Sequence, residues 1–451
     1  MSLLISNVLV DNQRCDITIV GSHITSIVTA KSDSRRGHTA SAEHEETCDC
    51  SGEPEKPVEQ PQEVIDGTSL AAFPGLVNGH THAAMSLFRG FGDDLPLETW
   101  LNDKIWPNEK HLDEDIVYWG SRLACLEMIK SGTTCFNDMY FLQQQTAQAA
   151  ADSGMRAVLS LTGMDFFDPA QAETLKRRCR DWEKDLTPCT LSAANQEAML
   201  RYALSPHAIY TVSGDTLKWL KAFADEHQLL LHIHLAETQT EVDNSIKQNG
   251  VRPVTYLQKL GLLSPHTIVA HGLWLDDDEV KMLGDSGTCV VHNPNSNLKL
   301  ASGSQFRYNE LRDAGANVAI GTDGCSSSNN LDLIEAAKTM SLLQKGWRRD
   351  PLALPARETL QVVTRGGARA LNLNGGELKE GRLADLFLVN LDNLAFVPNN
   401  DTVSNLIYAA HGDCIDTTII NGRIVMRHRQ VTDERRIIQE ARRVARRLIH
   451  D

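Results

Sequence analysis

The sequence lacks several features that would place it in a broad class at once. Its 451 residues contain no run that approaches the ~20 apolar residues needed to span a bilayer. Lys and Arg number 44 against 59 Asp and Glu, and the net charge of −15 is opposite to the balance expected of a general nucleic-acid binder. These absences argue against membrane and nucleic-acid partners and leave a small-molecule substrate open.

The ten cysteines do not resemble the framework of a small disulfide-rich domain. They are spread over a long chain, and some lie inside apolar runs, as Cys125 does between Ala124 and Leu126. The first ten residues have no basic segment, and Ser6 and Asn7 interrupt their apolar run, which predicts a strand rather than a signal peptide. Together these features predict a reduced, cytoplasmic protein.

Motifs of several common enzyme classes are also missing. The sequence contains no Gly-x-Gly-x-x-Gly and no P-loop, and it lacks the combination of His-x-Glu with Pro-Cys-x-x-Cys that marks one class of zinc deaminases. Residues 284–287, Gly-Asp-Ser-Gly, are similar to a serine-protease segment, but they fall in a turn between a helix and a strand and no other residue supports a triad. The chemistry must therefore come from other residues.

What the sequence does contain is an alternation of strand and helix patterns across its middle. Strands are predicted at 76–80, 133–138, 156–162, 203–207, 229–235, 267–271, 288–292 and 317–321, with helices at 113–130, 216–227 and 276–283 among them. Eight strands separated by helices predict an α/β fold, a (β/α)₈ TIM-like barrel, which we place at residues 73–374.

The two ends of the chain have a different pattern. Short strands joined by turns are predicted within the first thirty residues, and strands return at 384–389 and 417–420. We expect residues 1–72 and 375–430 to form one small β-sandwich domain built from both chain ends.

Two further segments fit neither domain. Residues 31–63 are rich in Ser, Glu, Pro and Thr and poor in large apolar residues, which predicts a flexible insertion. Residues 431–451 place apolar residues on one helical face and Arg on the other, which predicts a C-terminal helix packed on the body of the protein.

Histidines at strand ends are the strongest chemical signal. His80 and His82 are residues i and i+2 of the first barrel strand, so they share one face. His232 and His234 form a second pair of this kind, and spacing does not choose between these two. Because barrel active sites lie at the C-terminal ends of the strands, these histidines are candidates for holding a metal ion.

Three more polar residues end or follow later strands. Glu237 comes shortly after His234, where a carboxylate could reach a substrate nitrogen, while His271 and Asp323 end two other strands. Imidazole and carboxylate groups of this kind are ligands that Zn²⁺ accepts, and Fe²⁺ as well. Each residue alone also fits a structural role, but their recurrence at successive strand ends favours a metal-dependent active site.

Longer motifs around these residues resemble a known family. The run from Pro74 to His82 is similar to the opening of the amidohydrolase superfamily. Further runs resemble the 5-methylthioadenosine/S-adenosylhomocysteine deaminases, which are related to chlorohydrolases and guanine deaminases. These runs lie at 83–90, 94–97, 100–101, 234–238, 292–300 and 321–324. The resemblance covers nearly the whole chain except residues 31–63.

The resemblance implies a metal site. His80, His82, His234 and Asp323 would hold the ion, which is expected to be Zn²⁺ with Fe²⁺ as the alternative. Relatives with two metals carry a bridging carboxylated Lys on the fourth strand. Residues 201–207 contain no Lys, so one ion per subunit is expected.

The resemblance also implies roles in catalysis and substrate binding. Glu237 would carry protons to the substrate ring, His271 would orient or deprotonate the water, and Asp323 would share both the proton transfer and the contact with substrate. Glu109 would bind the ribose hydroxyls, and His207 would be a further substrate-binding residue.

The implied reaction is hydrolytic deamination of the adenine ring of 5′-methylthioadenosine, with S-adenosylhomocysteine and adenosine as further substrates. Some members bind the amino-acid end of S-adenosylhomocysteine with an Arg that follows shortly after this point. Residues 155–163 contain Arg156 but no second Arg. The next residues, 164–167, are Met-Asp-Phe-Phe, which favours an apolar methylthio tail. The alternatives are an aminohydrolase of free bases or triazines, and a metal-binding protein without turnover. The expected partner is a purine nucleoside, and homo-oligomerisation stays open.

Overall fold

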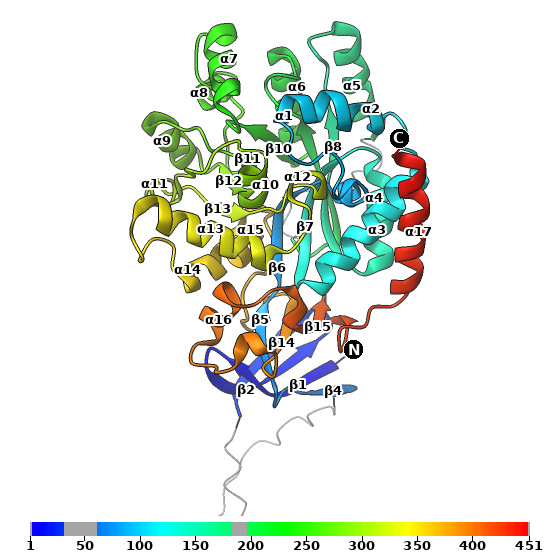
Figure 1. Cartoon of the computed structure of the whole chain (residues 1–451), viewed down its shortest axis with the longest axis vertical. Helices are drawn as coiled ribbons and strands as arrows, with labels where there is room; N and C mark the ends of the chain where they lie inside the picture. Colours follow the sequence, from blue (N-terminus) through cyan, green and yellow to red (C-terminus); the bar gives the residue numbers. More distant parts are fainter. Residues whose placement is uncertain (1, 31–60, 183–195, 450–451) are drawn as a thin grey trace, which may run out of the picture.

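The computed structural model of the protein describes residues 2–30, 61–182 and 196–449. The expected insertion at 31–63 lies mostly outside these ranges, and its last residue, Glu63, begins strand β4 (Glu63–Asp66). The described residues form two eight-stranded sheets. Figure 1 shows one sheet as a barrel surrounded by helices. The other sheet lies at the bottom of the view, and helices α5, α6, α7 and α8 lie at the top.

The first of these sheets confirms the predicted barrel. Its parallel strands pair in chain order, each with the next. They are β6 (Leu76–Thr81), β7 (Thr133–Tyr140), β8 (Arg156–Gly163), β9 (Leu200–Pro206), β10 (Leu230–Leu235), β11 (Thr267–His271), β12 (Cys289–His292) and β13 (Val318–Ile320). Most of their residues are buried, as expected for parallel strands covered on both faces.

Hydrogen bonds between the first and last strands close the barrel. The amide nitrogen of Asp323, just after β13, donates to the carbonyl of His80 on β6 at 3.1 Å. One layer below, the Asn78 side chain donates to the hydroxyl of Thr322 at 2.7 Å and accepts from its backbone amide at 3.1 Å. Two candidate site residues therefore lie directly at this closure.

Apolar side chains from every barrel strand fill the interior. The cluster contains Val77, Cys135, Val158, Ala203, Leu230, Ile268, Cys289, Val291 and Ala319. Ala368, Ala370 and Leu371 from α15 (Gly367–Ala370) and the residue after it complete the cluster. This layer fills one end of the barrel, and the buried His80, His234 and His271 lie at the other end, where the strands finish.

Helices surround the barrel. The longer ones are α3 (Glu114–Lys130), α4 (Gln143–Ser153), α5 (Pro169–Trp182), α6 (Gly214–Glu226), α7 (Gln239–Asn249), α9 (Asp277–Ser286) and α13 (Leu333–Arg348). The predicted start of α9 has a capping box: Asp276 accepts from the amide of Glu279 at 2.9 Å, and the Glu279 carboxylate accepts from the amide of Asp276 at 3.3 Å.

Three short segments precede α3 at the end of the barrel that holds the site. They are α1 (Leu97–Thr99), a π-helical turn at Trp100–Ile105 and α2 (Trp106–Glu109). Figure 1 shows α1 and α2 at the same end of the barrel as α5 and α6.

Strands from both ends of the chain form the second sheet, as the sequence predicted. The order is β16-β15-β14-β5-β1-β2-β3, and β4 pairs with β1. Their bounds are β1 (Ser2–Val10), β2 (Gln13–Val20), β3 (His23–Thr29), β5 (Leu70–Pro74), β14 (Leu386–Asn390), β15 (Ile415–Ile420) and β16 (Arg423–Met426). Ile5, Ile17, Ile65, Leu388 and Ile419 contribute to one buried cluster, so the two chain ends share a core.

A buried arginine joins this sheet to the barrel. Arg156, at the start of β8, pairs with Asp385 beside β14, and the Nε to Oδ2 distance is 2.8 Å. Its guanidinium also donates to the carbonyls of Glu197 and Ala198 at 2.6 and 3.0 Å. This side chain satisfies buried groups between the two sheets and lies far below the strand ends that carry the candidate site.

The C-terminal helix α17 (Glu434–Leu448) packs on α3. Figure 1 shows α17 in red at the right edge of the molecule. Ile437, Ala441, Val444 and Leu448 form its buried face. On the exposed side, Arg443 pairs with Asp115 at 2.8 Å, and Arg447 pairs with Asp115 at 2.7 Å. Among the helices in the described ranges, none has the length and apolar character that crossing a membrane requires.

Candidate active site

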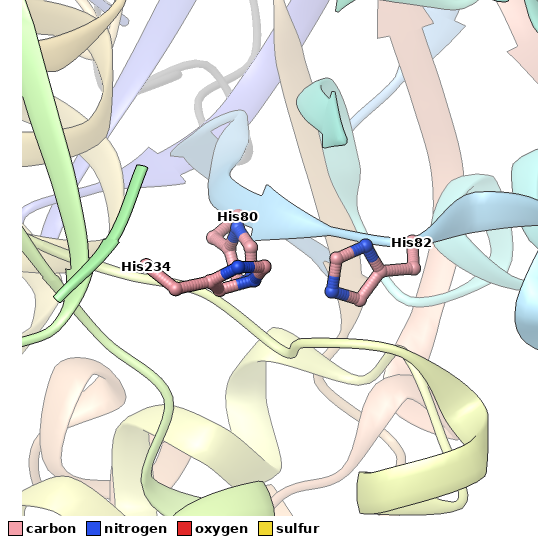
Figure 2. A group of neighbouring side chains, drawn as sticks. All are labelled: His80, His82 and His234. Carbon is pink, nitrogen blue, oxygen red and sulfur yellow. The ribbon is translucent and has the colours of Figure 1, made fainter. Parts of the chain in front are cut away.

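Three histidines from two strands meet at the C-terminal end of the barrel. The ligand nitrogens of His80, His82 and His234 all lie within 4.8 Å of one another. Figure 2 shows the three rings grouped together, two from β6 and its end and one from β10. The pairing of β6 with β7 shifts between Asn78 and Thr81, a bulge that places an extra residue opposite Asn137. Such a bulge re-aims the side chains beside it.

Each of the three rings is held by its second nitrogen. His82 contacts the carbonyl of Met139 through Nδ1, and His234 contacts the carbonyl of His207 in the same way at 2.9 Å. His80 Nδ1 lies 2.9 Å from His232 Nε2, and His80 Nε2 is buried without a hydrogen-bond partner. These contacts leave one nitrogen of each ring for a shared ion, as in protein metal sites generally.

The geometry distinguishes His234 from His232, which the spacing in the sequence did not. His234 belongs to the group that can hold an ion, whereas His232 lies behind His80 and contacts Asn137 Nδ2 at 3.1 Å through its own Nδ1. His232 therefore lies outside this group and contacts one of its members, His80.

Burial keeps two of the imidazoles in the metal-binding form. It lowers the pKa of His80 to about 4 and that of His234 well below the ordinary value. A neutral imidazole is the form that binds metal ions. His82 differs: burial lowers its pKa, but the Asp323 carboxylate more than offsets this and the pKa rises to about 9. The neighbouring carboxylate thus favours the protonated, positively charged ring of His82.

Asp323 faces two of the three histidines. Its Oδ1 lies 3.1 Å from His82 Nε2 and 3.3 Å from His80 Nε2. Burial alone would raise the pKa of Asp323, but the facing imidazoles of these histidines hold it well below its usual range. The other oxygen, Oδ2, accepts hydrogen bonds from Ser296 at 2.6 Å and Ser327 at 3.0 Å. Three nitrogens and one carboxylate oxygen make a donor set suited to zinc or iron.

Glu237 and His271 lie beside this group. Glu237 Oε2 is 3.8 Å from His271 Nε2, and its Oε1 accepts from the Ser302 hydroxyl at 3.3 Å. Burial raises the pKa of Glu237, which favours the protonated carboxyl. His271 is the last residue of β11, and Asn297 presents its amide nitrogen to the Nδ1 of this ring at 2.9 Å. That contact places the ring proton on Nε2, which faces Glu237.

Backbone strain also marks this end of the barrel. His271 has a φ of 76° and Asp323 a φ of 61°, in the left-handed region that L-residues with side chains seldom adopt. Such conformations persist where the surrounding structure imposes them, and they are common at functional sites.

The two residues expected to bind substrate lie at a cavity next to the histidines. A cavity of about 60 Å³ is lined by His82, Glu109, Thr162 and His207, together with Met85, Leu101, Ile105, Trp106, Met139, Tyr140, Phe141 and Met164. Glu109 accepts a hydrogen bond from the Tyr140 hydroxyl at 2.8 Å, and burial raises its pKa. His207 Nδ1 lies 2.9 Å from the Thr211 hydroxyl, and burial lowers the pKa of His207 to about 3.

Several residues that support the site were not predicted. Ser296 and Asn297 lie inside the 292–300 run, and a cluster of polar residues directly after a barrel strand was the available signal. Glu241 accepts from the amides of Ala236 and Glu237 at 2.9 and 2.8 Å, which fixes the loop that carries Glu237. No local pattern marked Glu241, because its role depends on the bend of the chain after β10.

Known proteins are similar to this chain over most of its length. The model of the Amidohydrolase family matches residues 71–425. A 5′-deoxyadenosine deaminase from Methanoregula boonei is 47% identical over 386 residues, 86% of each chain. The 5-methylthioadenosine/S-adenosylhomocysteine deaminase 1 of Archaeoglobus fulgidus is 43% identical over 389 residues, 85% of this chain and 90% of that protein.

A solved structure agrees with these matches. The crystal structure of an adenosine deaminase from Xanthomonas campestris with bound zinc superposes with a TM-score of 0.87 at 31% identity. The superposition covers 99% of this chain and 98% of that one. From the fold, the histidine group and these similarities, we conclude that the chain belongs to the amidohydrolase family.

Proposed function

We propose that this protein is a metal-dependent deaminase that hydrolyses the adenine ring of nucleosides, with 5′-methylthioadenosine and related 5′-modified adenosines as substrates. The observation that carries the proposal is a buried carboxyl, Glu237, and a histidine, His271, facing each other 3.8 Å apart beside the three-histidine site. Relatives named for 5′-deoxyadenosine and 5-methylthioadenosine deamination support the same reaction.

The ion in this proposal is Zn²⁺, one per chain, bound by His80, His82, His234 and Asp323, with Fe²⁺ as the alternative. The orphaned Nε2 of His80 and the Asp323 oxygen that faces two imidazoles fit this role. When bound, such an ion would lower the pKa of water to about 7 and so supply a nucleophile at neutral pH.

Glu237 is the proton donor to the substrate ring. Protonation of N1 withdraws electrons from C6 of adenine, and this makes C6 accept the attacking oxygen. The raised pKa of Glu237 suits it to hold that proton before attack. His271, whose ring orientation is set by Asn297, orients the water through its Nε2–H group, and Asp323 removes the proton of the water. Proton return to the amino group then releases ammonia and leaves the inosine-type product.

The sugar and the base contact the neighbouring cavity. Glu109 accepts hydrogen bonds from the two ribose hydroxyls, a role supported by the hydrogen bond from the Tyr140 hydroxyl that holds the Glu109 carboxylate. The neutral ring of His207 is held through Nδ1 by Thr211, which leaves Nε2 for the substrate. The described cysteines are buried and unpaired, which supports the cytoplasmic location that we also propose.

A substrate panel tests the reaction. We expect the purified protein with zinc to convert adenosine, 5′-deoxyadenosine and 5′-methylthioadenosine to their inosine forms, with one ammonia released per nucleoside. The loss of adenine absorbance and an ammonia assay measure this directly. Turnover of guanine or a triazine alone would favour the alternative aminohydrolase, and full metal binding without ammonia from any compound would contradict an enzyme.

Removal of Glu109 should abolish discrimination at the ribose. Comparison of adenosine with 2′,3′-dideoxyadenosine isolates the two hydroxyls, and we expect Glu109→Ala to lower kcat/KM for adenosine by about 10²-fold, because two hydrogen bonds to a charged group are lost. The dideoxy substrate should change little. Tyr140→Phe is the matched control, since it removes the fixing contact and keeps the carboxylate. A variant that still prefers adenosine by the wild-type ratio would show that Glu109 does not bind the sugar.

A further inference from the structure

We propose that Phe166 is a specificity-determining residue that contacts the substituent on C5′ of the nucleoside and selects for an uncharged, apolar one. This inference rests on the proposed function and adds to it a residue that selects among the substrates. The structure places Phe166 on the wall of a second cavity, outside the one that adjoins the histidines.

The outer cavity has a volume of about 550 Å³, and its apolar wall is formed by Trp106, Leu112, Phe141, Leu142, Met164 and Phe166. Trp106, Glu109, Phe141 and Met164 line both this cavity and the inner one. A ribose held by Glu109, with its base directed to the histidines, therefore has the outer cavity as the space for its 5′ substituent.

The chain holds Phe166 in an unfavourable backbone conformation. Phe166 and Phe167 are consecutive residues with φ values of 47° and 62°, a combination that bulky L-residues rarely adopt. The Asp165 carboxylate stabilises this turn by accepting from the amides of Phe167 and Ser213, each at 2.9 Å. The fold thus holds two phenylalanines, whose exposed fractions are 49% and 56%, in fixed directions although their backbone conformations are unfavourable.

The two exposed rings have different surroundings. Phe166 packs edge-to-face on Trp106, with 6.4 Å between ring centroids and 82° between planes, and both rings line the outer cavity. Phe167 is not among the residues lining the described cavities. A methylthio or methyl group entering between these aromatic walls would gain apolar and sulfur–aromatic contact.

The charge of the cavity agrees with an uncharged tail. Its charged residues are Glu109, already hydrogen-bonded to Tyr140, and Lys110, which is exposed. Met164 follows the end of β8 and lines both cavities, and its side chain carries no positive charge that could pair with a carboxylate. Lys110 is the residue through which an anionic tail would bind.

The test compares two substrates in matched variants. We expect Phe166→Ala to lower kcat/KM for 5′-methylthioadenosine by about tenfold, the size of effect that a lost apolar contact produces in a pocket. The value for adenosine, which carries only a hydroxyl at C5′, should fall by less than about twofold. Phe167→Ala is the matched control, with the same backbone conformation and chemical change, and should leave both values unchanged. Phe166→Leu should recover part of the preference, and thermal unfolding shows whether each variant is folded.

The outcomes separate this inference from the proposed function. A wild-type protein that deaminates no nucleoside contradicts the function itself. Wild-type deamination combined with an equal fall for both substrates in Phe166→Ala contradicts only the role of Phe166. A wild-type preference for S-adenosylhomocysteine that disappears in Lys110→Ala would also overturn the proposal, because the outer cavity would then select an anionic tail.

Discussion

In the Glu237→Gln variant we expect turnover of adenosine substrates to fall by about 10³-fold, within the range that general acid–base catalysis supplies. The amide cannot donate a proton to N1, yet it keeps the size of the side chain and can still accept from Ser302. Because Glu237 is outside the group of nitrogens that can hold the ion, the variant should bind one metal per chain. Initial rates and metal content measured on the same preparation test both statements.

A second carboxylate near the site provides the control for this prediction. Glu98 lies at a neighbouring cavity that Glu237 also lines, but it is exposed. Glu98→Gln should therefore leave the rate within about twofold of wild type, because surface substitutions rarely change more than this. A Glu237→Gln protein that contains metal and turns over at the wild-type rate would remove Glu237 from the mechanism.

Metal removal should abolish activity. Variants of the two histidines of β10 should differ in whether added zinc restores that activity. Chelation is expected to reduce the rate to background, and one equivalent of Zn²⁺ should restore it. His234→Ala removes a direct ligand, so we expect neither stoichiometric zinc nor measurable turnover. His232→Ala removes only the support of His80, and such changes weaken metal affinity about 10–100-fold, so excess zinc should restore this variant.

Zinc titrations followed by metal analysis and rate measurements distinguish the two variants. If His234→Ala bound zinc with the wild-type affinity, or if turnover were undiminished after complete chelation, the proposed metal site would be contradicted. Equal losses in both variants that excess zinc does not restore would show that His232 is a ligand as well.

Much of the barrel could be predicted from sequence because its signals are local. Each strand is a short run of buried residues next to a turn, and β11 (Thr267–His271) has the predicted bounds. The catalytic end was also predictable in outline, since the end of a parallel strand is visible in the chain. Strand limits such as the start of β9 at Leu200, three residues before the predicted one, depend on pairing with β8 and have no local signal.

The finer features of the site depend on contacts that no spacing rule contains. His232 and His234 lie two residues apart on one strand, so their side chains point to the same face. Only their different depths in the barrel decide which of them can join the metal-binding group. The shift in pairing beside Asn78 arises between two strands and leaves no mark in either alone. The positions of Glu241, Asn297 and Phe166 likewise depend on the paths of the segments that follow the strands, and the whole barrel sets these paths.

The closure of the barrel has a consequence for the stability of the whole chain. His80 and Asp323 join the first and last strands, and both also face the proposed ion. An ion bound to both would act as a cross-link between distant parts of the chain, and it would favour the native state by the free energy of its binding. Occupancy by metal and resistance to unfolding should therefore rise and fall together.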